Sequence, residues 1–281
     1  MVKFGPSGND LLFYEEGNKK SVEAPKWIKS KGLDLYEYSF GRGYRMSYET
    51  AENIGEEAKK QGIEISLHAP YFVNFGNPTS EAREKSIQYV IDGLIYLRKF
   101  GGNKLVVHPG SQLKQTREVA MKNAIEGIKE LVQRIYAEGL DDMYVCFETM
   151  GKKQQLGTVD EIIEICKIDK ILIPTVDFGH VNAVTGGSLK SKDDYEEIIN
   201  KIVTNLGFEK ANKMHIHFSK IEYTEKGEKM HLTLEDKIYG PEFEGLAQVL
   251  KEKGLSPTII CESKEIMAQD AMKLKEIYKK V

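Results

Sequence analysis

The chain has 281 residues, of which 41% are apolar and 30% are charged, and its formal net charge at neutral pH is -3. This content supports a full-sized core and excludes intrinsic disorder, while the charge balance excludes a generally cationic nucleic-acid coat. No run approaches the roughly 20 apolar residues of a membrane-spanning helix, and acidic residues interrupt the N-terminal segment before a signal-peptide core can form. Three cysteines without a Cys-x-x-Cys pair predict neither disulfides nor a thiolate zinc site, so we expect a cytoplasmic protein.

Eight short apolar runs alternate with amphipathic helical stretches from one end of the chain to the other. The runs cover residues 2–5, 33–40, 63–69, 104–110, 143–149, 171–179, 213–219 and 258–263, and the clearest helices are predicted at 47–62, 81–101 and 117–139. Such alternation implies parallel strands joined by helical crossovers, and eight units of about 35 residues are typical of a (β/α)8 TIM barrel. The alternative is an open doubly wound sheet, but GPSGND at 5–10 lacks the glycine pattern of its phosphate-binding loop.

We therefore expect an α/β protein consisting of one TIM-barrel domain over residues 1–281. Two connections that follow predicted strands, 69–80 and 220–240, are longer than plain turns. Long loops in compact domains are usually functional or mobile, and the loops after the strands of a barrel lie at its catalytic face.

Histidines and acids concentrate at the ends of the predicted strands. All six histidines lie there or in the loops just after, and none lies in a predicted helix: they are His68, His108, His180, His215, His217 and His231. Glu148, Asp177 and Glu262 end strands in the same way. A single histidine is usually structural and a single acid at a strand end often caps the next helix. So many groups at one rim would be costly without a neutralising partner, and divalent metal ions are the simplest one.

The types and number of these residues indicate which metal they would bind. Imidazole and carboxylate ligands without thiolates favour Zn²⁺, with Mn²⁺ or Fe²⁺ as alternatives. About eight candidate ligands exceed the three protein ligands of a typical single catalytic zinc, which implies two or three ions. A carboxylate such as Glu148 can bridge two ions roughly 3.5–4 Å apart, an arrangement that generates a nucleophile at neutral pH. A site of this charge would attract a phosphate ester.

With these residues in view, the chain resembles the endonuclease IV family of zinc-dependent apurinic/apyrimidinic (AP) endonucleases, and more loosely the wider xylose-isomerase-like barrels. The motifs that carry the resemblance are IEISLHAPYFVNFGNPTSEAREKS, LVVHPGS, FETMG, VDFGH, MHIHFSK and IICES. The resemblance implies a paired-metal site, bridged by Glu148 and with Glu148 and Glu262 as catalytic residues, that is formed by His68, His108, Glu148, Asp177, His215 and Glu262. It also implies a third zinc held by His180 and His231.

The resemblance further implies a reaction and a partner. The reaction is hydrolysis of the phosphodiester 5′ to an abasic site in double-stranded DNA during base excision repair, by an enzyme expected to be a monomer. Tyr71 occupies the position of an aromatic residue that the family inserts into the DNA groove. Arg42, Tyr44 and Arg45 lie in the loop that carries the family's other DNA-penetrating residues.

The sequence departs from the family pattern at three places. Lys229 stands where the family has the aspartate of its third zinc site, and Glu228 is the nearest carboxylate, which would serve as the ligand if the loop is one residue longer. The family's His-x-Asn-Asp motif reads His215-Ile216-His217-Phe218, and Thr149 replaces the asparagine after the bridging glutamate. Changes of this kind typically weaken metal affinity or activity by about 10–100-fold, so a two-metal enzyme with an altered substrate range is an alternative.

Two further hypotheses remain open. One is a sugar isomerase or epimerase that uses one divalent ion and a pair of carboxylates for proton transfer. The other is a binding or regulatory protein that keeps the pocket but has lost turnover, because an ammonium group at Lys229 would oppose a nearby cation.

Overall fold

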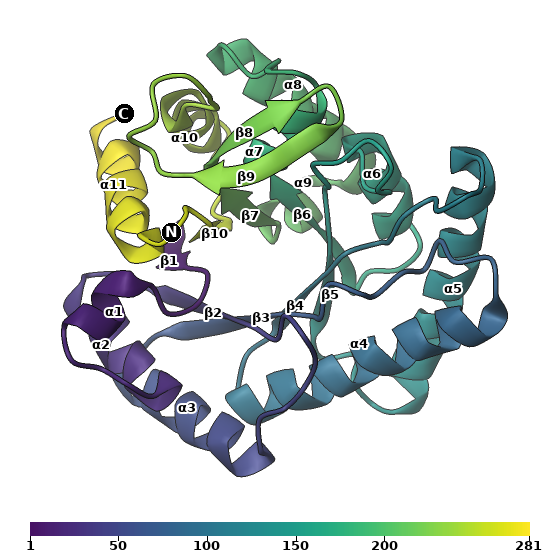
Figure 1. Ribbon diagram of the computed structural model, residues 1–281, viewed down its shortest axis with the longest axis horizontal. Helices are drawn as coiled ribbons and strands as arrows, with labels where there is room; N and C mark the ends of the chain where they lie inside the picture. The colour runs from purple at the N-terminus through teal and green to yellow at the C-terminus, as the bar shows by residue number, and fades with distance from the viewer.

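The computed structural model describes residues 1–281, and each of the eight apolar runs forms a strand of one parallel sheet. These strands are β1 (Lys3–Pro6), β2 (Leu35–Ser39), β3 (Glu64–His68), β4 (Lys104–Val107), β5 (Tyr144–Glu148), β6 (Leu172–Asp177), β7 (His215–Phe218) and β10 (Thr258–Cys261). They lie side by side in the order β1-β10-β7-β6-β5-β4-β3-β2, and the helices surround them (Figure 1). The predicted TIM barrel is confirmed.

Closure of the barrel joins β1 to β2. A parallel bridge pairs Ser7 with Glu37, and the backbone N–H of Gly8 donates to the carbonyl of Glu37 at 2.8 Å. The two strands approach so closely that a Cβ added at Gly5 would lie 1.8 Å from the carbonyl oxygen of Leu35. Only glycine fits at this position, and an open doubly wound sheet is excluded because its edge strands would not meet.

The helices follow the strands along the chain, and the last of them, α11, comes after β10. Their bounds are α1 (Leu11–Glu15), α2 (Ala24–Ser30), α3 (Tyr48–Gln61), α4 (Ser80–Phe100), α5 (Arg117–Ala137), α6 (Val159–Cys166), α7 (Phe178–Val184), α8 (Lys192–Leu206), α9 (Phe208–Asn212), α10 (Phe243–Glu252) and α11 (Met267–Lys280), with a 3-10 turn at Ser21–Glu23. The three helices predicted most clearly correspond to α3, α4 and α5. None of the helices is both long enough and apolar enough to cross a membrane.

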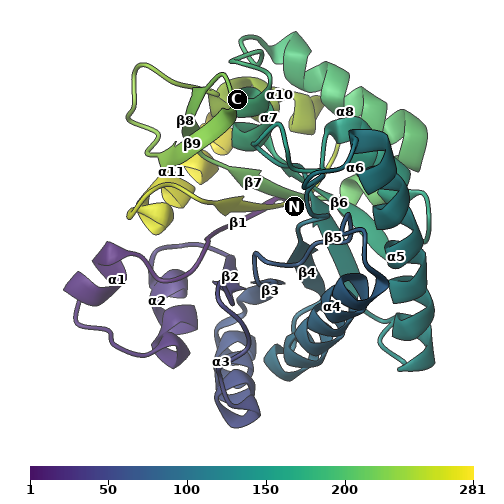
Figure 2. The same cartoon turned by 45° about the vertical axis from the view of Figure 1, so that its right-hand side comes forward.

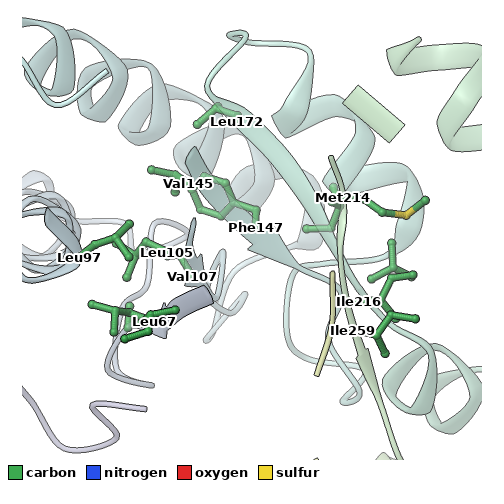
Figure 3. Packing of buried hydrophobic residues seen from close by; sticks show 14 of the residues in the cluster. Leu67, Leu97, Leu105, Val107, Val145, Phe147, Leu172, Met214, Ile216 and Ile259 are labelled. Atoms are coloured by element: carbon green, nitrogen blue, oxygen red, sulfur yellow. The ribbon is translucent and has the colours of Figure 1, made fainter. Parts of the chain in front are cut away.

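Most of the apolar core lies between the outside of the barrel and the surrounding helices. Alternate strand residues such as Leu67, Leu105 and Phe147 are fully buried there, and Leu97 of α4 packs against this layer (Figure 3). Alternation along a strand sends the intervening residues into the barrel. Only three of those form a second apolar cluster, Val106, Cys146 and Ile173, which are paired neighbours on β4, β5 and β6. Near the carboxyl ends of the strands, the interior of the barrel is occupied by polar side chains.

The long connection after β7 contains a hairpin. Its antiparallel strands, β8 (Lys220–Thr224) and β9 (Gly227–Leu232), form a separate two-stranded sheet. The hairpin packs against α7, the short helix that follows β6, and both views place it on the β6–β7 side of the molecule (Figure 1; Figure 2). It thereby places β9 beside the ends of the barrel strands.

Candidate metal centre

Glu148, the last residue of β5, lies at the centre of the candidate site. Its side chain is buried, and its Oε2 atom lies 3.3 Å from Nε2 of His68 and 3.0 Å from Nε2 of His108. Its other oxygen, Oε1, lies 3.0 Å from Nδ1 of His217. The two oxygens of one carboxylate therefore face two different sets of histidines, as a bridging ligand requires.

A second cluster shares Glu148 and adds residues from three further strands. Asp177 pairs with His217 in the register of β6 and β7, and this places both at the same height in the barrel. Glu262 follows β10, and its Oε2 atom lies 3.5 Å from Nδ1 of His217. Each of these four residues offers a ligand atom within 4.8 Å of the others. Four groups at that spacing can hold one cation.

A third cluster adjoins the first two and uses the hairpin. It consists of His180 on α7 with Glu228 and His231 on β9. The distances are 3.5 Å from His180 Nε2 to Glu228 Oε2 and 3.8 Å from His231 Nε2 to Glu228 Oε1. The predicted ligands His68, His108, Glu148, Asp177, His180, Glu228, His231 and Glu262 thus all lie at one mouth of the barrel.

Hydrogen bonds orient most of these histidines with Nε2 toward the carboxylates. The Nδ1 atom of His68 lies 2.8 Å from the carbonyl oxygen of Ala69, and that of His180 lies 2.9 Å from the carbonyl oxygen of Thr149. A carbonyl accepts from a protonated Nδ1, which leaves Nε2 as the unprotonated ligand atom in the neutral ring. The carbonyl of Thr149 supplies this contact through the backbone, so the side chain at that position is not required for it.

The metal-free site has strongly shifted pKa values. Burial alone would lower the pKa of His68, but its hydrogen bond to Glu148 and the negative charge there outweigh burial and raise it to about 9. The pKa of His180 is also raised to about 9, because the charges of Asp177, Glu148 and Glu228 outweigh burial. Burial raises the pKa of Asp177 above its usual range. Protonated imidazoles therefore compensate the buried acids when no cation is present.

The residues fit a divalent cation. The Oδ2 atom of Asp177 is fully buried and has no hydrogen-bond partner, an arrangement that is costly unless a cation coordinates the oxygen. The donor set consists of imidazoles and carboxylates, and none of the three buried free cysteines belongs to any of the clusters. Such donors suit Zn²⁺ or Mn²⁺.

The structure places His215 apart from the cluster of Glu148. His215 lies two residues before His217 on β7, so both side chains enter the barrel, but strand geometry places His215 roughly 7 Å deeper. Its Nε2 atom contacts Glu37 at 2.9 Å and its Nδ1 atom contacts Thr258 at 2.7 Å. His217 takes part in the cluster of Glu148, whereas His215 belongs with Glu37 and His217 to a separate group whose ligand atoms also lie within 4.8 Å of one another.

Glu37 on β2 is a residue that the motifs of the sequence do not indicate. It is fully buried inside the barrel, with Oε2 bonded to His215 and to the hydroxyl of Ser66 and with Oε1 3.0 Å from His217 Nε2. The available signal was an ionisable residue within the apolar run LDLYEYSF. A charged group inside a buried strand is expensive unless it has partners, and that makes it a candidate for a role at a site.

Lys229 does not face the third cluster. Its ammonium group extends to Glu222 on β8 at 2.6 Å, because neighbouring residues of β9 point to opposite sides of the hairpin. Glu228 therefore supplies the carboxylate next to His180. Gly151 makes this possible, since a Cβ there would lie 2.8 Å from both His180 Cδ2 and Glu228 Cβ.

A pocket of about 380 Å³ opens at the clusters, and one of the predicted DNA-binding residues lines it. Its walls include Lys152 and Tyr71, a residue that is 60% exposed. Arg42 and Arg45 are exposed on the neighbouring loop. Tyr44 differs from the expectation, because its ring stacks on Tyr96 and its hydroxyl donates to the carbonyl of Tyr89 at 2.8 Å. These contacts assign the Tyr44 side chain to packing.

The fold and this site define a known class of protein. The chain belongs to the family of xylose isomerase-like TIM barrels, whose sequence profile matches residues 25–277. This family consists of enzymes. Two relatives illustrate its similarity to this chain in sequence. An uncharacterized protein of Methanocaldococcus jannaschii is 31% identical over 278 residues, which are 99% of this chain and 97% of that protein. A probable endonuclease 4 of Listeria monocytogenes is 27% identical over 218 residues, which are 73% of this chain and 71% of that protein.

Solved structures with the same fold include two kinds of enzyme. A D-tagatose 3-epimerase-like protein matches with a TM-score of 0.71 and 24% identity, covering 91% of this chain and 90% of that one. Endonuclease IV from Thermus thermophilus matches with a TM-score of 0.67 and 19% identity, covering 94% and 96% respectively. These two likenesses are likenesses of fold, so the chemistry has to be argued from the site.

Proposed function

We propose that this protein is a metal-dependent phosphodiester hydrolase that cleaves double-stranded DNA 5′ to abasic sites. The observation that carries the proposal is the position of Glu148, which belongs to two metal-binding clusters at once while a third cluster adjoins them. Hydrolysis of a phosphodiester uses paired cations to stabilise both the attacking and the leaving oxygen. The sequence similarity to a probable endonuclease 4 supports the same reading.

Different residues of this chain would hold the cations and orient the substrate. Zn²⁺ would be held by the three clusters, and bound divalent cations would polarise the phosphate and activate the attacking water. Glu148 would bridge the first two clusters, with the imidazoles of His68 and His108 on one side and that of His217 on the other. Together, the clusters would orient the phosphate for attack in line with the leaving 3′-oxygen.

Glu262 is the best-placed group to handle a proton. Its side chain is 17% exposed, against 1% for Glu148 and 0% for Asp177, so among these carboxylates it faces the open mouth most directly. One of its oxygens accepts a hydrogen bond from the hydroxyl of Ser7 at 3.2 Å, which holds the carboxylate in place. We assign Glu262 the role of accepting a proton from the attacking water.

The rim would bind the DNA. Tyr71 offers an exposed aromatic face beside the pocket, suited to fill the space that a missing base leaves in the duplex. Lys152 lines the same pocket, and Arg42 and Arg45 supply cationic groups on the loop after β2. Selectivity would come from the ease of deforming DNA at a lesion without a base.

A sugar epimerase is the second candidate. One observation favours it: Glu148, Asp177, His217 and Glu262 form a four-residue cluster that suffices for one cation, with carboxylates available for proton transfer. An epimerase that uses one cation would have no function for the third cluster, which includes residues of the hairpin. For this reason the hydrolase is the preferred function.

The decisive experiment measures cleavage of a duplex oligonucleotide that contains one abasic-site analogue. The zinc-loaded protein is expected to nick the damaged strand 5′ to the lesion, to lose this activity in chelator and to leave an undamaged duplex intact. The Glu148→Gln variant is the matched negative control. In parallel, the Mn²⁺-loaded protein is incubated with D-tagatose and D-fructose. Epimerised sugar without any nicking by fully metallated protein would replace the hydrolase with the second candidate.

A further inference from the structure

The imidazole of His217 has the opposite orientation to those of His68 and His180. Its Nδ1 atom faces the carboxylates, 3.0 Å from Glu148 Oε1 and 3.5 Å from Glu262 Oε2. Its Nε2 atom points into the barrel toward Glu37. His68 and His180 instead turn Nδ1 to a backbone carbonyl and Nε2 to a carboxylate. His217 therefore needs a different partner to determine which ring nitrogen carries the proton.

Glu37 is the group available for that task. Its Oε1 atom lies 3.0 Å from His217 Nε2, off the direction of the ring N–H bond, and neither atom has a hydrogen-bond partner. Both side chains are fully buried, so water cannot replace either one. A carboxylate at this place would accept the Nε2 proton and leave Nδ1 unprotonated toward the mouth of the barrel.

Glu37 is itself held in a fixed position. Its second oxygen, Oε2, accepts a hydrogen bond from the hydroxyl of Ser66 at 2.8 Å and contacts His215 Nε2 at 2.9 Å. His215 is anchored in turn through its Nδ1 atom to the hydroxyl of Thr258 at 2.7 Å. The contact with His215 connects Glu37 to β7 and β10, and the hydroxyl of Ser66 adds a further hydrogen bond from β3.

We propose that Glu37 is a positioning residue for the metal centre, because it holds the proton of His217 on Nε2 and so presents Nδ1 as the ligand atom. This inference rests on the metal-binding part of the proposed function and does not depend on the substrate being DNA. It also gives His215 a role, namely to hold Glu37. Partners of this kind typically alter metal affinity by about 10–100-fold.

Substitutions at Glu37 test the proposal through metal binding. Zinc affinity of the purified full chain is measured by competition with a chromophoric chelator, without any DNA. Glu37→Gln keeps an oxygen that can accept the Nε2 proton but removes the charge, so a loss of about 10-fold for one zinc equivalent is expected. Glu37→Ala removes the acceptor as well, and a loss near 100-fold is expected for the same equivalent only.

Ser66→Ala is the matched control. It removes a buried hydrogen bond from the same carboxylate but leaves Oε1 of Glu37 opposite His217. We expect this variant to lower thermal stability and to bind every zinc equivalent within about 3-fold of the unmodified protein. An equal loss of affinity in Ser66→Ala would show that general disturbance of the interior suffices, and would overturn the proposal.

A measurement on the unmodified protein keeps the proposal testable if the Glu37 variants do not fold. Long-range ¹H–¹⁵N spectra of ¹⁵N-histidine-labelled, zinc-loaded protein report which nitrogen of each ring is protonated, with His217→Asn used to assign the signal. A proton on Nε2 of His217 and a metal on Nδ1 are expected, and the reverse pattern would overturn the proposal. If the unmodified protein binds no metal, the metal centre itself fails. If it binds metal and the Glu37 variants bind it equally well, only the role of Glu37 fails.

Discussion

One carboxylate oxygen of Asp177 caps the helix that carries His180, while the other accepts no hydrogen bond and lies 3.5 Å from Nδ1 of His180. Oδ1 accepts a hydrogen bond from the backbone N–H of His180 at 2.7 Å, and Oδ2 is buried without a hydrogen bond. A helix cap and a metal ligand are usually alternative explanations for an acid at a strand end. Here a single side chain serves the first role and is free for the second.

Asp177→Asn separates the two roles. Asparagine can still cap α7, but it lacks the negative charge, so we expect a loss of roughly 100-fold in metal affinity and in DNA cleavage. Because burial raises the pKa of Asp177, its ionised form costs stability at pH values above that pKa. The metal-free variant should therefore unfold at the same temperature as the unmodified protein or a higher one at pH 7.5. Metal analysis and calorimetry measure the two effects, and a strongly destabilised apoprotein would contradict this account.

Metal loading should release protons. The pKa values of His68 and His180 are raised to about 9, so both imidazoles are protonated at pH 7.5 and must lose a proton to bind metal. We expect proton release on addition of Zn²⁺ to be large at pH 7.5 and to fall as the pH rises through about 9. A weakly buffered titration with a pH indicator measures it. His68→Gln should lower the yield by about one proton, and release that is independent of pH would contradict the shifted pKa values.

Neighbouring residues on β9 should behave differently. Glu228→Gln removes a charged ligand of the third cluster, and we expect the loss of one metal equivalent with the others retained. Lys229→Ala changes an exposed side chain paired with Glu222, so metal content should not change. Elemental analysis of both variants measures how many metal equivalents each one retains. Loss of metal in Lys229→Ala alone would mean that the hairpin is arranged differently in solution.

Gly151→Ala tests the same cluster by steric means. The new methyl group would lie 2.8 Å from atoms of both His180 and Glu228, so these side chains must move apart. We expect one metal equivalent to bind at least 10-fold more weakly and the free energy of unfolding to fall by about 1–3 kcal/mol. Chelator competition and chemical denaturation measure the two quantities. Unchanged affinity would indicate that the third cluster tolerates displacement and is not a ligand set.

Tyr71→Ala should affect DNA binding and not metal content. Stacking of a base on an aromatic side chain is worth about 1–3 kcal/mol, so affinity for a duplex with an abasic site should fall roughly 5–100-fold. Tyr136→Ala is a suitable control, because that exposed tyrosine lies near the C-terminal end of α5 and bonds to Asp169. Fluorescence anisotropy measures the affinity. Metal loss in the Tyr71 variant would refute a role limited to DNA contact.

Much of the fold follows from the local pattern of the sequence. Each apolar run became a strand because its alternate residues are apolar enough to pack on the outer helices, as Leu67 and Phe147 do. The rim residues His68, His108, Glu148, Asp177 and Glu262 were likewise predictable, since parallel strands end on one face. The same pattern does not define depth. His215 and His217 share a face, and only the register of β7 with β6 shows that His217 lies level with Asp177.

Other parts of the site depend on long-range contacts that a linear pattern does not contain. Glu37 acquires its meaning from His215 and His217, which are about 180 residues away in the sequence and meet it only when the barrel closes. The orientation of Lys229 depends on the hairpin, which was expected only as a long loop. Tyr44 lies in a segment with the composition of a surface loop, yet its side chain stacks on the ring of Tyr96 and donates a hydrogen bond to the carbonyl of Tyr89.

The hairpin of β8 and β9 makes the third cluster separable from the rest of the protein. It contributes two of that cluster's three ligands, whereas the other two clusters come entirely from the ends of barrel strands and the residues just after them. Shortening this single excursion would leave the shared pair of clusters intact and remove only the outer group. A scaffold of this kind can gain or lose one cation, and with it affinity for a polyanionic substrate, through an insertion at one point without rebuilding its interior.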